Sequence, residues 1–221
     1  MIKELTWEIC KCLKDGYYMA ALTSALTIPD MCGKAEFPDL EKQTKKRYVD
    51  WFDKYIGNYE KERHGEKGMP YLSGELVYSL RCSLLHQGNP NIEDKISYKN
   101  NIIYFELIYQ RHDGASRHTG AAEAQLIRID GEEKAVNIKY CIDIKLLCYK
   151  LCIAARDYYN KNKEKFDFFN YKIVGLDFNT KRNLGVSINE TAFDYKNDNE
   201  ELDIDVLYKM ACEFYFNGRG N

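Results

Sequence analysis

Residues 73–88 read SGELVYSLRCSLLHQG and carry the clearest fold signal in the chain. Ser73 is a residue type that favours the N-cap of a helix, and Gly88 followed by Asn-Pro is typical of a helix end. Between these two signals, leucine and valine recur with the spacing of one helical face. The stretch therefore predicts an amphipathic helix over residues 74–87.

The same helical spacing extends over much of the rest of the chain. Apolar residues recur every three to four positions over residues 3–26, 40–56 and 146–159, and we expect a helix in each range. Pro29 predicts the end of regular structure after the first helix, and the charged stretch 57–68 predicts a solvated loop. The chain is 45% hydrophobic and 14% aromatic, which is enough to bury a core. These features favour a bundle of packed helices.

A β-rich region interrupts the helical pattern before the last of these helices. Residues 102–109, 122–129 and 135–142 form runs typical of strands, and Asp130-Gly131 favours a hairpin turn. The runs predict a small antiparallel β insertion at about residues 102–142. The expected fold class is therefore mainly α, a helical bundle with a small antiparallel β insertion, or α+β overall.

The length of 221 residues suits one body with an extension. We expect the helical bundle and its β insertion over residues 1–162, and a C-terminal extension over residues 163–221 that packs on the same body. Within the extension, the pattern predicts a short strand at 171–178 and a closing helix at 204–216.

Charge and cysteine usage exclude several classes of protein. A net charge of -2 argues against a dedicated polyanion binder, although a local basic cleft remains compatible with it. No apolar run approaches the roughly 20 residues of a membrane span, and the N-terminal residues do not resemble a signal peptide. The eight cysteines lack the spacing of a disulfide scaffold or a zinc ribbon. We expect reduced thiols, no membrane association and a cytoplasmic protein.

Arg81 and His86 are the strongest candidates for chemistry. They lie five residues apart near the end of the predicted helix, and about 140° apart around its axis, away from its leucine face. A guanidinium binds a phosphate through two hydrogen bonds, and an imidazole can take and return a proton near neutral pH. The pair therefore suits metal-independent cleavage of a phosphodiester in RNA, where the ribose 2′-OH serves as the nucleophile.

The R-x4-H pattern of Arg81 and His86, near the end of an apolar helix, resembles the motif of the HEPN superfamily. That family includes RNA-cleaving toxins and antiviral effectors. The resemblance covers at most residues 1 to about 160 and implies a bundle of four or five helices. It also implies a metal-independent, cofactor-free endoribonuclease acting on single-stranded RNA. The implied assembly is a homodimer in which the two R-x4-H segments share a cleft, with an antitoxin or a sensor protein as a candidate further partner.

Other interpretations of these residues stay open. Arg81 can anchor a carboxylate such as Asp30 or Asp50, while His86 caps carbonyls at the end of the helix. Cys82 and His86, one turn apart, can form a nucleophile and a base, although no third group is identified. The alternative function is a non-catalytic module of the same fold that binds a nucleotide, RNA or a protein partner, and a purely structural subunit is a third.

A polar loop is the second candidate for contact with RNA. Arg111, His112, Arg117 and His118 lie between two predicted strands, where arginines and backbone amides can hold phosphates. Exposed hairpin connections are also commonly this polar without a function. A basic cluster at residues 42–47 likewise either steers a phosphate backbone or forms a solvated helix face. No set of histidines and cysteines completes a metal site, so we expect no metal.

Overall fold

The computed structural model describes residues 2–64, 71–88, 96–98, 101–108, 120–129 and 132–168. The chain divides into two compact units, Met1–Lys161 and Asn162–Asn221. In the second unit the structure describes a single short 3-10 helix, η3 (Lys163–Phe166). The strand predicted at 171–178 and the helix predicted at 204–216 lie outside the described residues.

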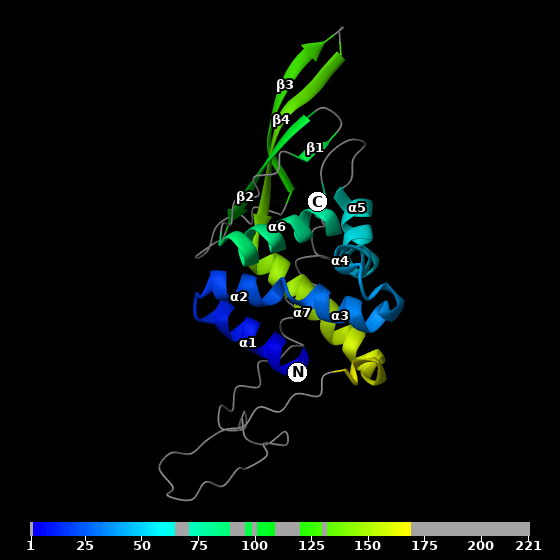
Figure 1. The fold of residues 1–221 in the computed structure, drawn as a ribbon. Coiled ribbons are helices and arrows are strands. Elements are labelled where there is room, and N and C mark those ends of the chain that lie inside the picture. The colour runs from blue at the N-terminus through cyan, green and yellow to red at the C-terminus, as the bar shows by residue number, and fades with distance from the viewer. Residues whose placement is uncertain are drawn as a thin grey trace, which may run out of the picture. The chain divides into compact units, whose positions relative to one another are not determined.

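Helices form most of the described part of the first unit (Figure 1). They are α1 (Ile2–Lys14), α2 (Tyr18–Ala25), α3 (Ile28–Glu36), α4 (Thr44–Phe52), α5 (Asn58–His64), α6 (Gly74–Gln87) and α7 (Ile144–Lys161), with a 3-10 turn η1 (Pro38–Leu40) and a π-helical turn η2 (Asp53–Gly57). The long helix α7 packs against α1, α2 and α3, while α4 packs against α3 and α6. The mainly α fold class is confirmed. None of the described helices is long and apolar enough to cross a membrane.

The first predicted helix, residues 3–26, is two helices in the structure. Gly16 separates α1 from α2 with a φ of 82°, a conformation that suits glycine because it has no Cβ. Pro29 does not end regular structure, and that prediction is wrong. It lies in the first turn of α3, where a proline is tolerated because its missing N–H would have no helical partner.

Helix α6 forms as the sequence predicts. The Ser73 hydroxyl oxygen accepts a hydrogen bond from the backbone N–H of Leu76 at 3.3 Å. At the other end, Gly88 adopts a φ of 66° and its N–H bonds to the carbonyl of Ser83. Both ends of the helix that carries Arg81 and His86 are therefore capped by local interactions.

The loop predicted over residues 57–68 is helical at residues 57–64, contrary to the prediction, and residues 65–68 lie outside the described residues. It contains helix α5, and the Glu60 carboxylate on that helix is buried against the ammonium of Lys150 on α7, at 2.7 Å. In the second predicted helix, the α-helical part ends at Phe52, and the chain then continues as the π-helical turn η2. The buried Glu60–Lys150 ion pair therefore attaches the polar helix α5 to α7.

The four strands form one small mixed sheet in the order β1-β2-β4-β3. They are β1 (Ile96–Tyr98), β2 (Asn101–Ile108), β3 (Gly120–Ile129) and β4 (Glu132–Asp143). The antiparallel prediction is wrong for the central pair, because β2 and β4 run parallel. β1 and β2, and β3 and β4, are antiparallel, and Ile129 pairs with Glu132 across the predicted hairpin. The two-residue connection holds β3 next to β4, whereas the longer stretch between β2 and β3 lets β4 lie between them.

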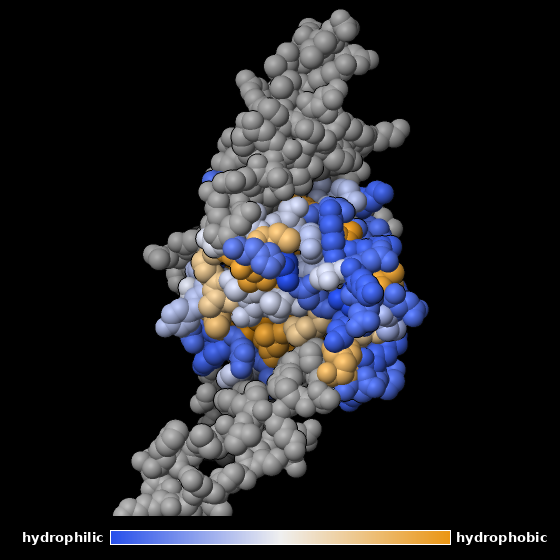
Figure 2. Space-filling view, in the orientation of Figure 1, coloured by the Kyte–Doolittle hydropathy of each residue, from blue (hydrophilic) through white to orange (hydrophobic). Residues whose placement is uncertain are grey.

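The core of the helical body is built from large apolar side chains. Those that are almost fully buried include Trp51, Tyr48, Phe52, Tyr158, Ile9, Leu22, Leu26 and Leu80. The aromatic side chains of α4 are thus part of the core. Figure 2 shows that the face carrying α3, α4 and α5 is largely hydrophilic. At the edge of this core, Arg81 of α6 contacts Asp30 of α3.

Candidate functional site

Helix α6 presents Arg81 and His86 beside its apolar face. Leu76, Val77 and Leu80 are buried, whereas His86 is exposed and the Arg81 side chain is 18% exposed. The helix therefore uses one face for the core and leaves its C-terminal polar residues at the surface. This is the placement that the helical spacing predicts.

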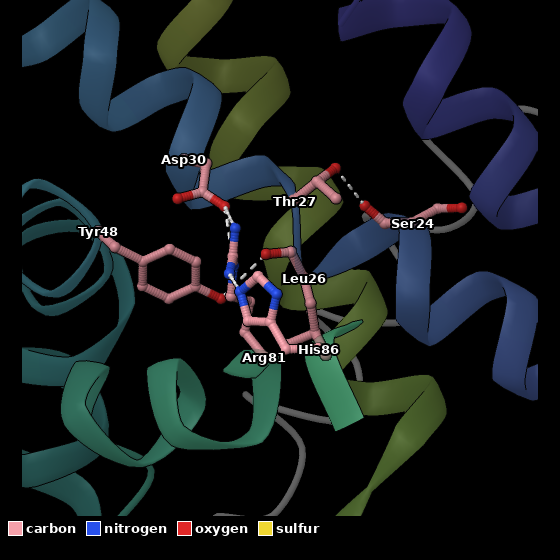
Figure 3. A network of polar contacts seen from close by, with 7 residues as sticks. All are labelled: Ser24, Leu26, Thr27, Asp30, Tyr48, Arg81 and His86. Carbon is pink, nitrogen blue, oxygen red and sulfur yellow. Dashed lines mark hydrogen bonds and ion pairs between the residues drawn. The ribbon is translucent and has the colours of Figure 1, made fainter. Parts of the chain in front are cut away.

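Arg81 and His86 are in direct contact. The distance from Arg81 Nη1 to His86 Nε2 is 2.6 Å, and Figure 3 shows the imidazole ring beside the guanidinium. A guanidinium has no acceptor, so Arg81 must be the donor and His86 Nε2 the acceptor. This hydrogen bond requires that Nε2 carry no proton, which assigns the imidazole proton to Nδ1.

Asp30 on α3 binds the other side of the same guanidinium. Its Oδ2 accepts a hydrogen bond from Arg81 Nε at 3.1 Å and forms an ion pair with Arg81 Nη2, also at 3.1 Å (Figure 3). The interpretation of Arg81 as an anchor for Asp30 therefore describes a contact that is present. Asp50 is engaged elsewhere, with Lys46 one turn before it.

Burial dominates the electrostatics of this group. It raises the pKa of Asp30 above the usual value, and the positive charges of Arg81 and Arg47 only partly oppose the shift. Burial alone would lower the pKa of Arg81, but the Asp30 carboxylate reverses the effect, so the guanidinium stays charged. Asp30 Oδ1 is buried and has no hydrogen-bond partner among the described residues. The Asp30 carboxylate is thus partly desolvated, and it contacts Arg81 through Oδ2 alone.

Tyr48 and Leu26 lie next to the Arg81–Asp30 ion pair (Figure 3). The sequence predicted neither residue as part of the site. The Tyr48 hydroxyl donates a hydrogen bond to the Leu26 carbonyl at 3.1 Å, and burial raises the pKa of Tyr48 far above its usual range. This bond ties α4 to the end of α2, immediately before Asp30. Only the three-dimensional packing brings these residues together, so no local signal in the sequence marks them.

The remaining candidates take separate places. Arg111, His112, Arg117 and His118 lie outside the described residues. In the basic cluster, Lys45 is exposed and pairs with Glu75 on α6 at 2.7 Å. A search of the described residues finds no group of three or more histidine, cysteine or acidic side chains able to hold a metal ion.

The alternative pairing of Cys82 with His86 is not the contact observed. His86 Nε2 faces Arg81, and the Cys82 sulfur instead interacts with the Arg81 guanidinium and with Tyr78. The structure therefore brings together Arg81, His86 and Asp30, with Cys82 at their edge.

Comparison with known proteins adds no assignment. No family model matches the chain, and neither the curated proteins nor the solved structures contain a match to it.

Proposed function

We propose that the protein is a metal-independent endoribonuclease of HEPN type that cleaves single-stranded RNA, with Arg81 and His86 as its catalytic residues. The observation that carries this proposal is the 2.6 Å contact between the guanidinium and the imidazole on α6. A permanent cation that can bind a phosphate stands beside a group that can move a proton. The R-x4-H resemblance is consistent with the same chemistry.

The ion pair with Asp30 leaves Arg81 able to bind a phosphate. Of the five N–H donors of a guanidinium, the Nε–H bonds to Asp30, one Nη1–H bonds to His86, and Nη2 forms an ion pair with the same Asp30 oxygen. Each terminal nitrogen carries two N–H groups, so each keeps one that neither partner uses. We expect a charged phosphate oxygen to accept these N–H groups.

The chemical step is transesterification. The ribose 2′-oxygen forms a bond to phosphorus while the bond from phosphorus to the 5′-oxygen breaks, giving a 2′,3′-cyclic phosphate and a 5′-hydroxyl. His86 Nε2 takes the proton of the 2′-OH once the exposed imidazole ring turns away from Arg81 Nη1 and a phosphate oxygen accepts that N–H instead. Arg81 stabilises the negative charge on the phosphorane. In the proposed homodimer, the second copy of His86, acting in its imidazolium form, supplies the proton to the 5′-oxygen and becomes neutral, while the first copy becomes the imidazolium.

The proposed setting is a cytoplasmic toxin or antiviral defence effector whose activity an antitoxin or a sensor protein restrains. The seven cysteines among the described residues are free thiols, as is usual in a reducing compartment. His86 is exposed, which leaves it accessible to a strand of RNA. These features support the proposal, and the cleavage assay tests it.

The assay is cleavage of end-labelled single-stranded RNA with EDTA present, comparing wild type with His86→Ala and Arg81→Ala. Ser79→Ala, a half-buried serine on the same helix, is the matched control. We expect each catalytic substitution to lower the rate by at least about 100-fold and the control to leave it unchanged. The wild-type products should carry 2′,3′-cyclic phosphate ends, and a 2′-deoxy substitution at the cleaved nucleotide should abolish cleavage.

The second candidate is a non-catalytic module that binds a nucleotide, RNA or a protein partner. The Arg81–Asp30 ion pair favours a non-catalytic role for Arg81, because Asp30 already balances its charge within the protein. Retained RNA binding without cleavage by the folded wild type would support this candidate. Cleavage at equal rates by wild type and both alanine variants would remove Arg81 and His86 from the chemistry.

A further inference from the structure

The geometry of Asp30 restricts the direction in which Arg81 can point. One oxygen, Oδ2, binds both Nε and Nη2 of the guanidinium, each at 3.1 Å. A guanidinium is planar and rigid, so fixing two of its nitrogens also fixes the third. The third nitrogen, Nη1, is the one that meets His86. Asp30 therefore controls a residue that it does not itself touch.

We infer that Asp30 is a positioning residue: by binding Nε and Nη2 of Arg81, it aims Nη1 at His86 Nε2 and selects the tautomer of His86 that is protonated on Nδ1. In water a neutral histidine prefers the proton on Nε2, so holding the opposite tautomer requires a fixed donor at Nε2. The catalytic part of this inference rests on the proposed function. The tautomer itself is a property of the protein without RNA.

The placement of Asp30 supports this role over that of a simple charge partner. The carboxylate is only 22% exposed, and its Oδ1 is buried without a hydrogen-bond partner among the described residues. Burying a carboxylate with one oxygen unsatisfied costs free energy that a purely structural ion pair would be expected to avoid. Such a cost is understandable where the charge orders a neighbouring group.

The backbone around Asp30 holds it in place. Pro29 restricts φ in the first turn of α3, and the Thr27 hydroxyl donates to the Ser24 carbonyl at 2.7 Å just before that turn. The hydrogen bond from Tyr48 to the Leu26 carbonyl adds a tie to α4. Figure 3 shows Tyr48, Leu26, Thr27 and Ser24 together with the Arg81–Asp30 pair. Two local constraints and one hydrogen bond from α4 thus hold the segment that leads into Asp30.

The tautomer has a functional consequence. While Arg81 donates to Nε2, the lone pair of that nitrogen is occupied and cannot accept a proton from a 2′-OH. A phosphate oxygen that accepts the Nη1 N–H in place of the imidazole uncovers the base, because the His86 ring is then released while Asp30 keeps the guanidinium in place. Binding of the substrate and activation of His86 are then coupled through one side chain, with Asp30 as its fixed support.

The test is the tautomer of His86, measured by two-bond ¹H–¹⁵N correlation spectra of the full chain without RNA, at a pH where the imidazole is neutral. The chain has four histidines, so a His86→Gln spectrum identifies the signals of His86. We expect the Nδ1-protonated form in wild type and a shift of the population toward the Nε2-protonated form in Asp30→Asn. Asp50→Asn is the matched control, because it removes an aspartate that pairs with Lys46 instead, and should change nothing.

Two results overturn the inference. The first is a wild-type His86 that already carries its proton on Nε2. The second is a folded Asp30→Asn variant in which the Nδ1-protonated form persists as in wild type. Should Asp30→Asn fail to fold, Asp30→Glu replaces it, since one additional methylene moves the carboxylate and is expected to shift the tautomer in the same direction.

The kinetic readout separates this inference from the proposed function. In the RNA cleavage assay we expect Asp30→Asn to lower kcat on the order of 10- to 100-fold with little change in KM. If wild type does not cleave RNA, the proposed function fails while the spectra still decide the tautomer. If wild type cleaves and the Asp30→Asn tautomer is unchanged, the positioning role alone fails.

Discussion

At the scale of single residues, buried charges determine how the site and the body respond to change. Asp30 is engaged by Arg81, whereas Glu60 is enclosed with Lys150 between α5 and α7. The two pairs differ in exposure: the Arg81 and Asp30 side chains are 18% and 22% exposed, and those of Lys150 and Glu60 are 8% and 3% exposed. Losing one partner should matter most where water cannot replace it.

The Lys150–Glu60 pair gives the first stability prediction. Lys150→Met leaves the Glu60 carboxylate buried without its cation, and should lower the free energy of unfolding by about 3–5 kcal/mol. The double variant Glu60→Gln, Lys150→Met should recover much of that loss. Lys161→Met breaks an exposed pair on the same helix and should cost less than about 1 kcal/mol. Urea unfolding measures all of these, and a loss in Lys150→Met no larger than in Lys161→Met would contradict the assignment.

Asp30 gives a prediction for the pH dependence of stability. Because burial raises its pKa in the folded protein, the folded state holds the proton more tightly than the unfolded chain does. Ionising Asp30 therefore costs stability as the pH rises from below its unfolded pKa through its folded pKa. Relative to Asp30→Asn, wild type should lose unfolding free energy over that acidic range. Urea unfolding at a series of pH values checks this, and a wild type that gains stability relative to the variant as the pH rises would refute it.

At the scale of elements, the close approach of α3 and α4 decides where Asp30 stands. Gly33 lies on α3, and a Cβ there would come within 2.8 Å of the Arg47 carbonyl oxygen on α4. Backbone cannot move aside as a flexible side chain can. The two helices meet at this glycine, three residues after the carboxylate that binds Arg81.

Gly33→Ala should therefore separate α3 from α4 and destabilise the fold by about 1–3 kcal/mol. Lys34→Ala, at an exposed neighbouring position on the same helix, is the matched control and should change stability by less than about 0.5 kcal/mol. Thermal unfolding followed by circular dichroism compares the two. Equal melting temperatures for both variants would show that the helices do not meet as closely as described.

At the scale of the whole molecule, local signals were the predictable part of the fold. Ser73 and Gly88 cap α6, and Asp143 accepts a hydrogen bond from the Leu146 N–H at the start of α7, each within a few residues. Pro29 was misread because a proline is compatible with both the end and the first turn of a helix. The strand order was misread because it depends on which strands meet across a long connection, which periodicity does not encode.

For the candidate site too, the sequence predicted some features and not others. Arg81 and His86 share one helix, so their position near its end followed from the sequence, whereas their direct contact did not, because residues five apart lie about 140° apart around the axis. The sequence predicted Asp30 and Asp50 as alternative carboxylate partners of Arg81. Charge alone predicts that the partner is a carboxylate, whereas the packing of the helices determines that it is Asp30. The use of a single carboxylate oxygen and the resulting tautomer of His86 depend on atomic positions. The tie from Tyr48 to Leu26 depends on contacts between residues far apart in sequence.

The most direct measurement is the rate at which folded His86→Ala cleaves single-stranded RNA in EDTA, relative to wild type and Ser79→Ala prepared alongside. The account predicts cleavage by wild type and Ser79→Ala, with a rate at least about 100-fold lower in His86→Ala. Cleavage by His86→Ala at the wild-type rate, or no cleavage by wild type across varied RNAs, would contradict the claim that Arg81 and His86 form a ribonuclease site.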